Sequence, residues 1–345
     1  MTTEISLETN YGGLHLASPV VMGACPMTMQ EPTRNALQSA GAGAVVFPSL
    51  FEEQLIQWCK DTDRPVSKAE QIVMDRSERI RTHWACPNAE SYLALINRAT
   101  TTRSLPVIAS LNGYTAGGWV DFAGELQEVG AAAIELNVHH SQPRNYESSS
   151  EIEDRIIGAV RDIRASITIP LFVKLGRGFT SIPHIATRLL SGAQGLVLHG
   201  RDPQVDICLD SMKLATKWKL SVADCGIDSL DTLMQVHGFC PAMPLAASGG
   251  IAHADDVTKV LLAGADVAMV TSAVYRDGPD IVRTMLDGLR SFMKKNNMNC
   301  IGDLQTHRPL QFTSDEERSA YTTALSARLG TSQAQTGNQS IRAGN

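Results

Sequence analysis

A lysine that follows a short apolar run is the first residue in this sequence with reactive chemistry. Lys174 comes directly after Leu171–Val173, a run typical of a buried strand. At the end of such a strand, its amine could form a Schiff base, or its charge could neutralise a negative charge on a cofactor. A solvated lysine that takes no part in chemistry is the third interpretation.

Two glycine- and hydroxyl-bearing segments have the composition of a phosphate site. Ser248-Gly249-Gly250 ends one apolar run and opens a helical segment, and Thr271-Ser272 ends the next run. Glycines allow backbone N–H groups to approach a phosphate, and the start of a helix favours an anion. The pair of segments therefore predicts phosphate binding, and a plain tight turn at the two glycines is the alternative.

A polar segment with adjacent histidines follows another apolar run. Asn137 stands at its start, where an amide could hydrogen-bond a planar heterocycle, and His139, His140, Ser141 and Gln142 come next. Two adjacent histidines cannot both face one site on regular structure, so at most one of them acts as an acid or base. Adjacent histidines also lack the spacing of metal ligands, and we predict no metal site.

Small residues and a second asparagine complete the set of candidates. Ala24 and Cys25 follow Val20–Met22, and their size would let a flat ring approach the backbone. Asn112 ends the run that begins at Val107. No base stands beside Cys25, which predicts a packed thiol and not a nucleophile.

The elements that must position these residues are strands alternating with helices. Eight apolar runs separated by amphipathic segments indicate parallel strands that are buried on both faces. Eight such units in one chain predict an α/β fold, a (β/α)8 barrel, whose functional residues lie at the carboxyl ends of the strands. The runs are Val20–Met22, Ala44–Phe47, Val107–Leu111, Ala132–Leu136, Leu171–Val173, Gly195–Leu198, Leu245–Ala247 and Val267–Val270.

Other segments predict additions to the barrel. Alternation around a Gly-Gly pair in Ile5–Leu16 predicts a β-hairpin that plugs the barrel bottom. Ser150 and Glu153 have the spacing of a capping box at a helix start. Two long connections, residues 51–88 and 199–226, predict lids or substrate loops over the carboxyl-terminal face.

Length and composition set the remaining limits. The chain has 345 residues, 43% of them hydrophobic and 19% charged, which excludes a disordered or fibrous protein. We predict one domain over residues 1–330 and a disordered polar tail over 331–345. The net charge of −6 and the lack of basic clusters argue against nucleic-acid binding.

The seven cysteines and the hydropathy pattern bear on location. The cysteines are dispersed and include no C-x-x-C pair, which favours reduced thiols over disulfides or zinc. The start of the sequence does not have the pattern of a signal peptide, and no run approaches the ~18 apolar residues of a membrane span. We expect a cytoplasmic protein with no membrane partner.

In this order, the candidate residues resemble those of the dihydroorotate dehydrogenase family of FMN-containing barrels. The similarity runs from about Ile5 to Asn296. It implies that FMN is the cofactor and that Ala24 and Cys25 lie under its isoalloxazine ring. It also implies that Asn112, Asn137 and Lys174 contact the flavin, with the lysine balancing charge on the reduced ring.

The resemblance also implies roles at the two ends of the site. Ser248, Gly249, Gly250, Thr271 and Ser272 match the family's loops for the FMN phosphate. Pro87-Asn88 is similar to a Pro-Asn pair whose asparagine holds the pyrimidine substrate, and Gln142 and Asn137 are expected to orient substrate as well. Many barrels of this family are dimers, which leads us to expect a homodimer.

Three departures from the family pattern fall on the substrate side. The family's catalytic Cys or Ser after the fourth strand is replaced by His140, so His140 is the candidate base, with His139 and Ser141 as alternatives. The family's lysine after the second strand is Pro48 here, and an asparagine after the sixth strand is Gly200. The FMN site thus resembles the family, whereas the orotate site looks rebuilt.

These features support three hypotheses. The first is an FMN oxidoreductase that acts on a CH–CH bond of a small, dihydropyrimidine-like substrate. The second is an aldolase or isomerase without flavin that uses Lys174. The third is a flavin-binding scaffold that has lost catalysis and works through a partner protein. The electron acceptor stays open between fumarate, a quinone and a redox partner protein.

Overall fold

The computed structural model divides the chain into two units, residues 1–309 and 310–345. The predicted domain boundary near residue 330 and the predicted tail lie outside the described residues and stay predictions. The described residues are 5–77, 85–101, 105–113, 119–138, 148–200, 204–217, 219–223, 227, 229–308, 318–319 and 322–323.

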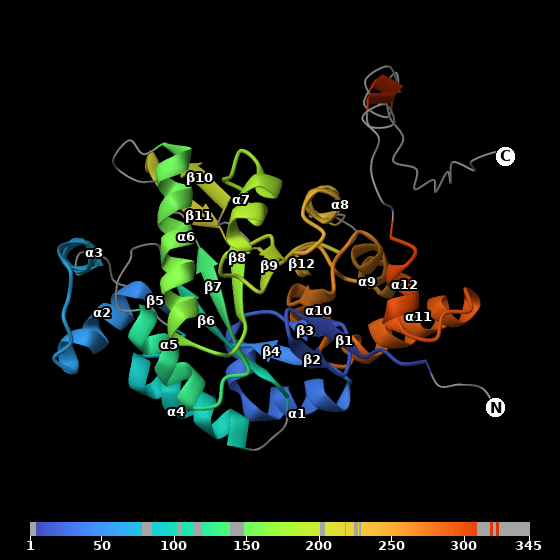
Figure 1. Ribbon diagram of the computed structural model, residues 1–345, viewed down its shortest axis with the longest axis horizontal. Coiled ribbons are helices and arrows are strands. Elements are labelled where there is room, and N and C mark those ends of the chain that lie inside the picture. Colours follow the sequence, from blue (N-terminus) through green and yellow to red (C-terminus); the bar gives the residue numbers. More distant parts are fainter. Residues whose placement is uncertain are drawn as a thin grey trace. The chain divides into compact units, whose positions relative to one another are not determined.

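Eight parallel strands close into a barrel in the first unit (Figure 1). They are β3 (Val20–Met22), β4 (Ala44–Val46), β6 (Val107–Asn112), β7 (Ala133–Val138), β8 (Leu171–Leu175), β9 (Gly195–Leu198), β12 (Leu245–Ser248) and β13 (Val267–Val270). Their order is β4-β3-β13-β12-β9-β8-β7-β6, and hydrogen bonds between β4 and β6 close the ring. The predicted (β/α)8 barrel is confirmed.

Alternate residues of these strands face the barrel interior. Burial on both faces explains why the strands stand out in the sequence as unbroken apolar runs. The other face of each strand packs against helices as part of the larger core cluster. The interior cluster consists of Tyr11, Leu16, Val21, Ala44, Val46, Ile108, Ala133, Phe172, Val197, Ala246, Val267 and Met269.

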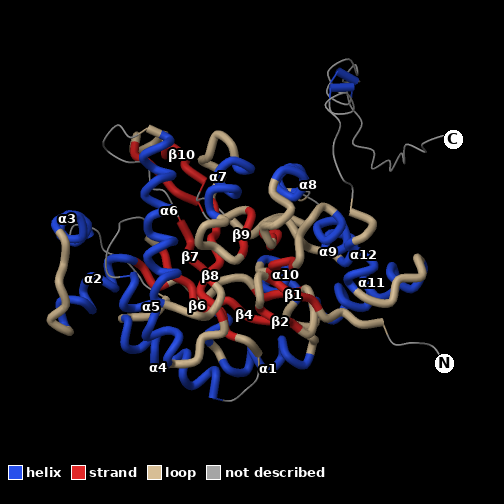
Figure 2. Tube along the Cα trace, viewed as in Figure 1, coloured by secondary structure: helices blue, strands red, loops and turns tan. Residues whose placement is uncertain are grey.

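After each strand the chain continues into at least one helix, and a ring of outer helices surrounds the strands (Figure 2). They are α1 (Glu31–Ser39), α4 (Ala89–Thr101), α5 (Trp119–Glu128), α6 (Ser149–Ser166), α7 (Ile182–Leu189), α8 (Leu230–Phe239), α9 (Ala254–Leu262) and α11 (Ile281–Lys295). Shorter helices are η1 (Pro26–Met29), α10 (Ser272–Asp277) and α12 (Ile301–Gln305). None of the helices in the described ranges has the length and apolar character to cross a bilayer.

The predicted capping box of α6 is wrong by two residues. The helix begins earlier than its apolar periodicity suggests, and Ser148 is the N-cap. Its Oγ accepts a hydrogen bond from Glu151 N at 3.3 Å, and Glu151 Oε2 accepts one from Ser148 N at 2.7 Å. Glu153 instead accepts a hydrogen bond from Arg188 on α7, at 2.9 Å.

The predicted N-terminal hairpin is present and projects a side chain into the barrel. Strands β1 (Thr9–Tyr11) and β2 (Leu14–Leu16) pair antiparallel. The Tyr11 ring stacks on Phe172, with 4.1 Å between centroids, and its hydroxyl donates a hydrogen bond to Leu196 O at 3.0 Å. Tyr11 is fully buried, so the hairpin forms part of the core.

The two long connections contain regular structure and leave the carboxyl ends of strands. The first holds β5 (Leu50–Phe51), α2 (Glu52–Asp61) and α3 (Lys68–Ser77). The second holds an antiparallel hairpin of β10 (Gln204–Cys208) and β11 (Lys213–Lys217). Its apolar side chains Val205, Ile207 and Leu214 are exposed to solvent.

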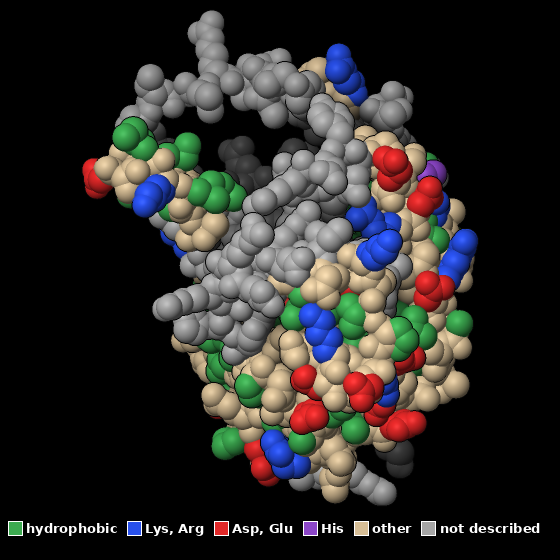
Figure 3. Space-filling model, turned by 90° about the vertical axis from the view of Figure 1, so that its left-hand side faces the viewer, with side chains coloured by type: hydrophobic (Ala, Val, Ile, Leu, Met, Phe, Trp, Pro, Cys, Tyr) green, Lys and Arg blue, Asp and Glu red, His purple; other side chains and the backbone are tan. Residues whose placement is uncertain are grey.

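The described surface shows mixed charge. On the face in Figure 3, acidic and basic side chains are interspersed over the part of the chain that the structure describes. Among the described residues, Arg188 forms an ion pair with Asp154, and Arg290 forms one with Asp287. Mixed charge of this kind does not resemble a phosphate-backbone footprint.

The contacts of Tyr11 predict a large contribution to stability. We expect Tyr11→Ala to lower the free energy of unfolding by about 3–5 kcal/mol, because it removes a buried ring. Tyr11→Phe keeps the ring but leaves the Leu196 carbonyl without this donor, and should cost about 1 kcal/mol. Urea unfolding followed by circular dichroism measures both changes.

The matched control is His15→Ala, a substitution at an exposed position of the same hairpin. It should change the free energy of unfolding by less than about 0.5 kcal/mol. If Tyr11→Ala were as stable as His15→Ala, the hairpin would not be part of the core.

Candidate active site

Three polar side chains lie side by side at the barrel mouth because of the strand register. Asn112 on β6 is paired with Asn137 on β7, and Asn137 is paired with Lys174 on β8. All three are partly exposed, at the carboxyl ends of otherwise buried strands. The structure therefore brings together the three residues predicted to contact a planar cofactor.

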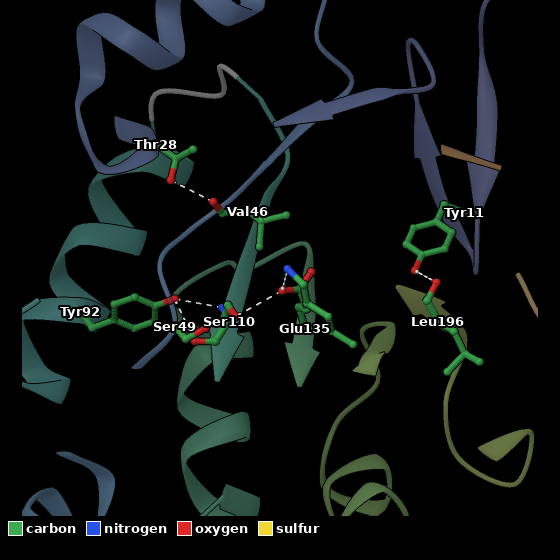
Figure 4. A network of polar contacts seen from close by, with 9 residues as sticks. Tyr11, Thr28, Val46, Ser49, Tyr92, Ser110, Glu135 and Leu196 are labelled. Carbon is green, nitrogen blue, oxygen red and sulfur yellow. Dashed lines mark hydrogen bonds and ion pairs between the residues drawn. The ribbon is translucent and has the colours of Figure 1, made fainter. Parts of the chain in front are cut away.

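A chain of polar side chains continues from Lys174 into the barrel interior. Lys174 Nζ lies 3.5 Å from Glu135 Oε1, which also accepts a hydrogen bond from Ser110 Oγ at 3.5 Å. Ser110 Oγ is 2.8 Å from Ser49 Oγ. The backbone N–H of Ser110 donates a hydrogen bond to the Tyr92 hydroxyl at 2.9 Å. Figure 4 shows Ser49, Ser110 and Glu135 next to one another on neighbouring elements.

Sequence reasoning missed Glu135 and Ser110, although a signal exists for both. Ser110 precedes Asn112 by two residues, and Glu135 precedes Asn137 by two residues. Residues two apart in a strand lie on the same face of it. Ser110 therefore faces the barrel interior together with Asn112, and Glu135 does so together with Asn137. An acidic residue inside an apolar strand run is unusual enough to be noticed.

The opposite side of the mouth has the shape expected of a phosphate cradle. Gly249 and Gly250 have φ angles of +96° and +76°, a backbone conformation that favours glycine. A Cβ on Gly249 would meet no atom within 4 Å among the described residues, so open space lies beside this turn. Ser248 ends β12 directly before the turn and is partly exposed.

Close packing joins the ends of β3 and β13. Gly23 N donates a hydrogen bond to Val270 O at 2.9 Å. A Cβ on Gly23 would lie 2.5 Å from Thr271 Oγ1, so only glycine leaves the Thr271 hydroxyl in its place. The predicted segments that begin at Gly23 and Thr271 are therefore neighbours in space.

Cys25 lies beside these segments as a packed thiol. Burial raises the pKa of the Cys25 thiol, and Tyr275 hydrogen-bonds to it. A raised pKa keeps the thiol protonated at neutral pH, which is the form expected of a packing residue. Ala24 is half-buried and packs against the interior cluster.

The second long connection returns to the predicted phosphate loop. Ser221 N donates a hydrogen bond to Ser272 Oγ at 3.1 Å. The Arg276 guanidinium, on the same short helix as Ser272, donates to Ser221 O. The segment that carries the β10–β11 hairpin is thus fixed to α10 at its far end.

No group of three His, Cys, Asp or Glu side chains that could hold a metal ion occurs within the described ranges. In the part of the mouth that the structure describes, the polar groups are amides, hydroxyls, the Lys174 ammonium and backbone N–H groups. Donors of this kind suit an anionic, planar and hydrogen-bonding organic group better than a cation.

Comparisons with known proteins agree with this geometry. The family model described as dihydroorotate dehydrogenase matches residues 84–293. This chain belongs to the dihydroorotate dehydrogenase family. A putative dihydroorotate dehydrogenase A (fumarate) of Aeropyrum pernix is 26% identical over 226 residues, covering 64% of this chain and 73% of that protein.

Two further relatives align with most of the chain. The catalytic subunit of dihydroorotate dehydrogenase B (NAD(+)) of Methanocaldococcus jannaschii is 24% identical over 307 residues, with 86% of this chain and 96% of that one covered. The subunit of the same name in Thermoplasma volcanium is 24% identical over 305 residues, with 86% and 97% covered. The chain is a dihydroorotate dehydrogenase-like oxidoreductase.

The substrate side of this dihydroorotate dehydrogenase-like site is described only in part. His139, His140, Ser141 and Gln142 lie outside the described residues, and their predicted roles stay predictions. Asn88 is exposed, and its Oδ1 accepts a hydrogen bond from Ser91 N at 2.8 Å, which caps α4. Its predicted contact with substrate is untested.

Gly200 borders the polar row at the mouth. Its N–H donates a hydrogen bond to Leu175 O at 2.8 Å. A Cβ at this position would lie 3.7 Å from Asn137 Oδ1 and 3.8 Å from Lys174 Cγ, which is ordinary contact. A Cβ would therefore fit at this position, and the glycine leaves room of that size beside the asparagine and the lysine.

The contact of Gly23 with Thr271 predicts a measurable coupling. Gly23→Ala should lower the free energy of unfolding by about 1–3 kcal/mol, because the Thr271 hydroxyl must move. Thr271→Ala removes that hydroxyl. In the Thr271→Ala protein, Gly23→Ala should therefore lower the free energy of unfolding by at least ~0.5 kcal/mol less than it does in the native protein. Urea unfolding of the single and double variants gives the coupling energy.

Gly124→Ala is the control, since a Cβ at Gly124, within α5, meets no atom within 4 Å. It should stabilise the protein by about 0.5–1 kcal/mol through helix propensity alone. Additive effects of Gly23→Ala and Thr271→Ala would contradict the predicted close approach.

Proposed function

We propose that this protein is an FMN-dependent oxidoreductase that acts on a CH–CH bond of a small, dihydropyrimidine-like substrate. The observation that carries the proposal is the row of Asn112, Asn137 and Lys174 on three adjacent strands of a dihydroorotate dehydrogenase-family barrel. This row presents two amides and one ammonium at the barrel mouth. Those groups match the carbonyl and nitrogen edge of a flavin ring.

The residues around the mouth fit such a cofactor in size and polarity. The positive φ angles of Gly249 and Gly250, and the open space beside Gly249, allow backbone N–H groups to face a phosphate. The hydroxyls of Ser248, Thr271 and Ser272 supply further donors. Ala24 and Cys25 are small enough for a flat ring to lie against the end of β3.

Each predicted residue then has a defined task. When bound, FMN would accept or donate hydride at its N5 atom. Lys174 would hold positive charge beside the ring, Asn137 and Gln142 would orient substrate together with Asn88, and His140 would move the substrate proton. The side chain of histidine ordinarily has a pKa of ~6.5, so its neutral imidazole can accept a proton near neutral pH.

The remaining sequence predictions belong to this proposal as well. They are a homodimer, a cytoplasmic location and an electron acceptor that is fumarate, a quinone or a redox partner protein. Ser141 and His139 are the alternatives to His140 as base.

The first test is the identity of the cofactor and its reaction. The purified protein should be yellow, release FMN on denaturation, and lose flavin absorbance when dihydroorotate or a related dihydropyrimidine is added without oxygen. Lys174→Met should slow this bleaching by about 100-fold, because a charge-stabilising group is removed. Lys294→Met, an exposed lysine on α11, should leave the rate unchanged.

A colourless protein that does not bind FMN would overturn the proposal. In that case, borohydride trapping of a carbonyl substrate on Lys174 would support the aldolase or isomerase hypothesis. Tight FMN binding without turnover of any dihydropyrimidine would support the scaffold hypothesis.

The proposed base has its own test in pre-steady-state kinetics. His140→Ala should slow anaerobic flavin reduction by about 10²–10⁴-fold while FMN stays bound, since proton transfer loses its acceptor. His139→Ala is the matched control and should reduce flavin at nearly the native rate. A reversal of the two effects would assign the base to His139.

A further inference from the structure

Glu135 is a fully buried carboxylate with one cationic partner. Its side chain lies on the interior face of β7, and its exposed fraction is 0%. Lys174 Nζ, at 3.5 Å, is its only ion-pair partner within the described ranges. Its second oxygen, Oε2, has no hydrogen-bond partner among the described residues.

A carboxylate in this position is costly for the fold. Removing a charge from water is unfavourable, and a buried ion pair is often no more stabilising than two apolar side chains of similar size. The neighbouring interior positions are filled by Ala133, Ile108 and Phe172, which shows that apolar residues fit this space. Packing alone therefore does not explain Glu135.

The strand register places this charge directly below the mouth. Lys174 is paired with Asn137, and Glu135 precedes Asn137 by two residues on the same face of β7. The carboxylate thus lies deeper in the barrel than the backbone of Lys174. The Lys174 side chain is 12% exposed, and its ammonium is contacted by Glu135 from the interior side of the barrel.

The hydrogen bonds around Glu135 keep the carboxylate in place. Ser110 Oγ donates to Glu135 Oε1, the same oxygen that faces Lys174. The backbone N–H of Ser110 is bonded to the buried Tyr92 hydroxyl, and its Oγ is bonded to Ser49. Three neighbouring elements therefore fix the position of the Glu135 side chain (Figure 4).

We propose that Glu135 is a positioning residue that holds the Lys174 ammonium at the floor of the cofactor site and sets the net charge there. This inference rests on the proposed function, because the charge matters for a flavin that gains electrons. With Glu135 ionised, the pair has no net charge. Without it, Lys174 presents a full positive charge to the ring.

The direction of the effect follows from this charge. Reduction adds negative charge to the flavin, and a net positive charge beside the ring stabilises the reduced form. E135Q keeps the shape of the side chain and removes its negative charge. It should therefore make reduced FMN bind more tightly relative to oxidised FMN and raise the midpoint potential of the bound flavin.

The test is an anaerobic potential titration of the intact flavoprotein. In E135Q, we expect the affinity for reduced FMN to rise about tenfold relative to the affinity for oxidised FMN. This change raises the midpoint potential by ~30 mV for a two-electron couple. S110A removes a hydrogen bond to the same carboxylate without changing its charge and should shift the potential far less. An E135Q potential equal to or below the wild-type value would overturn the proposal.

A second measurement needs no flavin and separates this inference from the proposed function. K174M leaves the Glu135 carboxylate without its cation and should lower the melting temperature by about 5 °C or more. Adding E135Q to K174M removes the unpaired charge and should restore most of this loss. If the double variant melts no higher than K174M, the pair does not exist, whether or not FMN binds.

Discussion

The hydrogen bonds between parallel strands decide which side chains meet in this protein. Closure of the ring by β4 and β6 fixes the register of every strand, and alternation along each strand selects the residues that face inward. Asn112, Asn137 and Lys174 are neighbours only because β6, β7 and β8 are paired at these positions. A slip of one residue in any of these strands would turn its polar group toward the helices.

This dependence explains what could be predicted from the sequence. Runs such as Val20–Met22 and Val267–Val270 identified the strands because parallel strands buried on both faces must be apolar throughout. The barrel follows from eight such runs, and the residues at their ends follow from the barrel. The predicted start of α6 at Ser150 is two residues too late. The helix is capped by Ser148 and Glu151, about half a turn before that position.

The features that were missed depend on contacts between distant parts of the chain. The close approach of Gly23 to Thr271 exists only after the first and last strands pair, and no local pattern encodes it. The β10–β11 hairpin has strand-like alternation at Val205 and Ile207, but it lies within a connection that its length alone marked as a loop. Glu135 lies inside β7, three residues before the strand end, and the rule that functional residues stand at the ends of barrel strands does not point to it.

The two inward side chains of β8 show how stability and chemistry are separated within one strand. Phe172 stacks on Tyr11 from the hairpin at the barrel bottom and contributes apolar burial. Lys174, two residues later on the same face, faces the mouth and pairs with Glu135. An ion pair of this kind adds little to folding, which agrees with the role that we propose for it at the mouth. The apolar contacts below it supply the rigidity that keeps both charged groups in register.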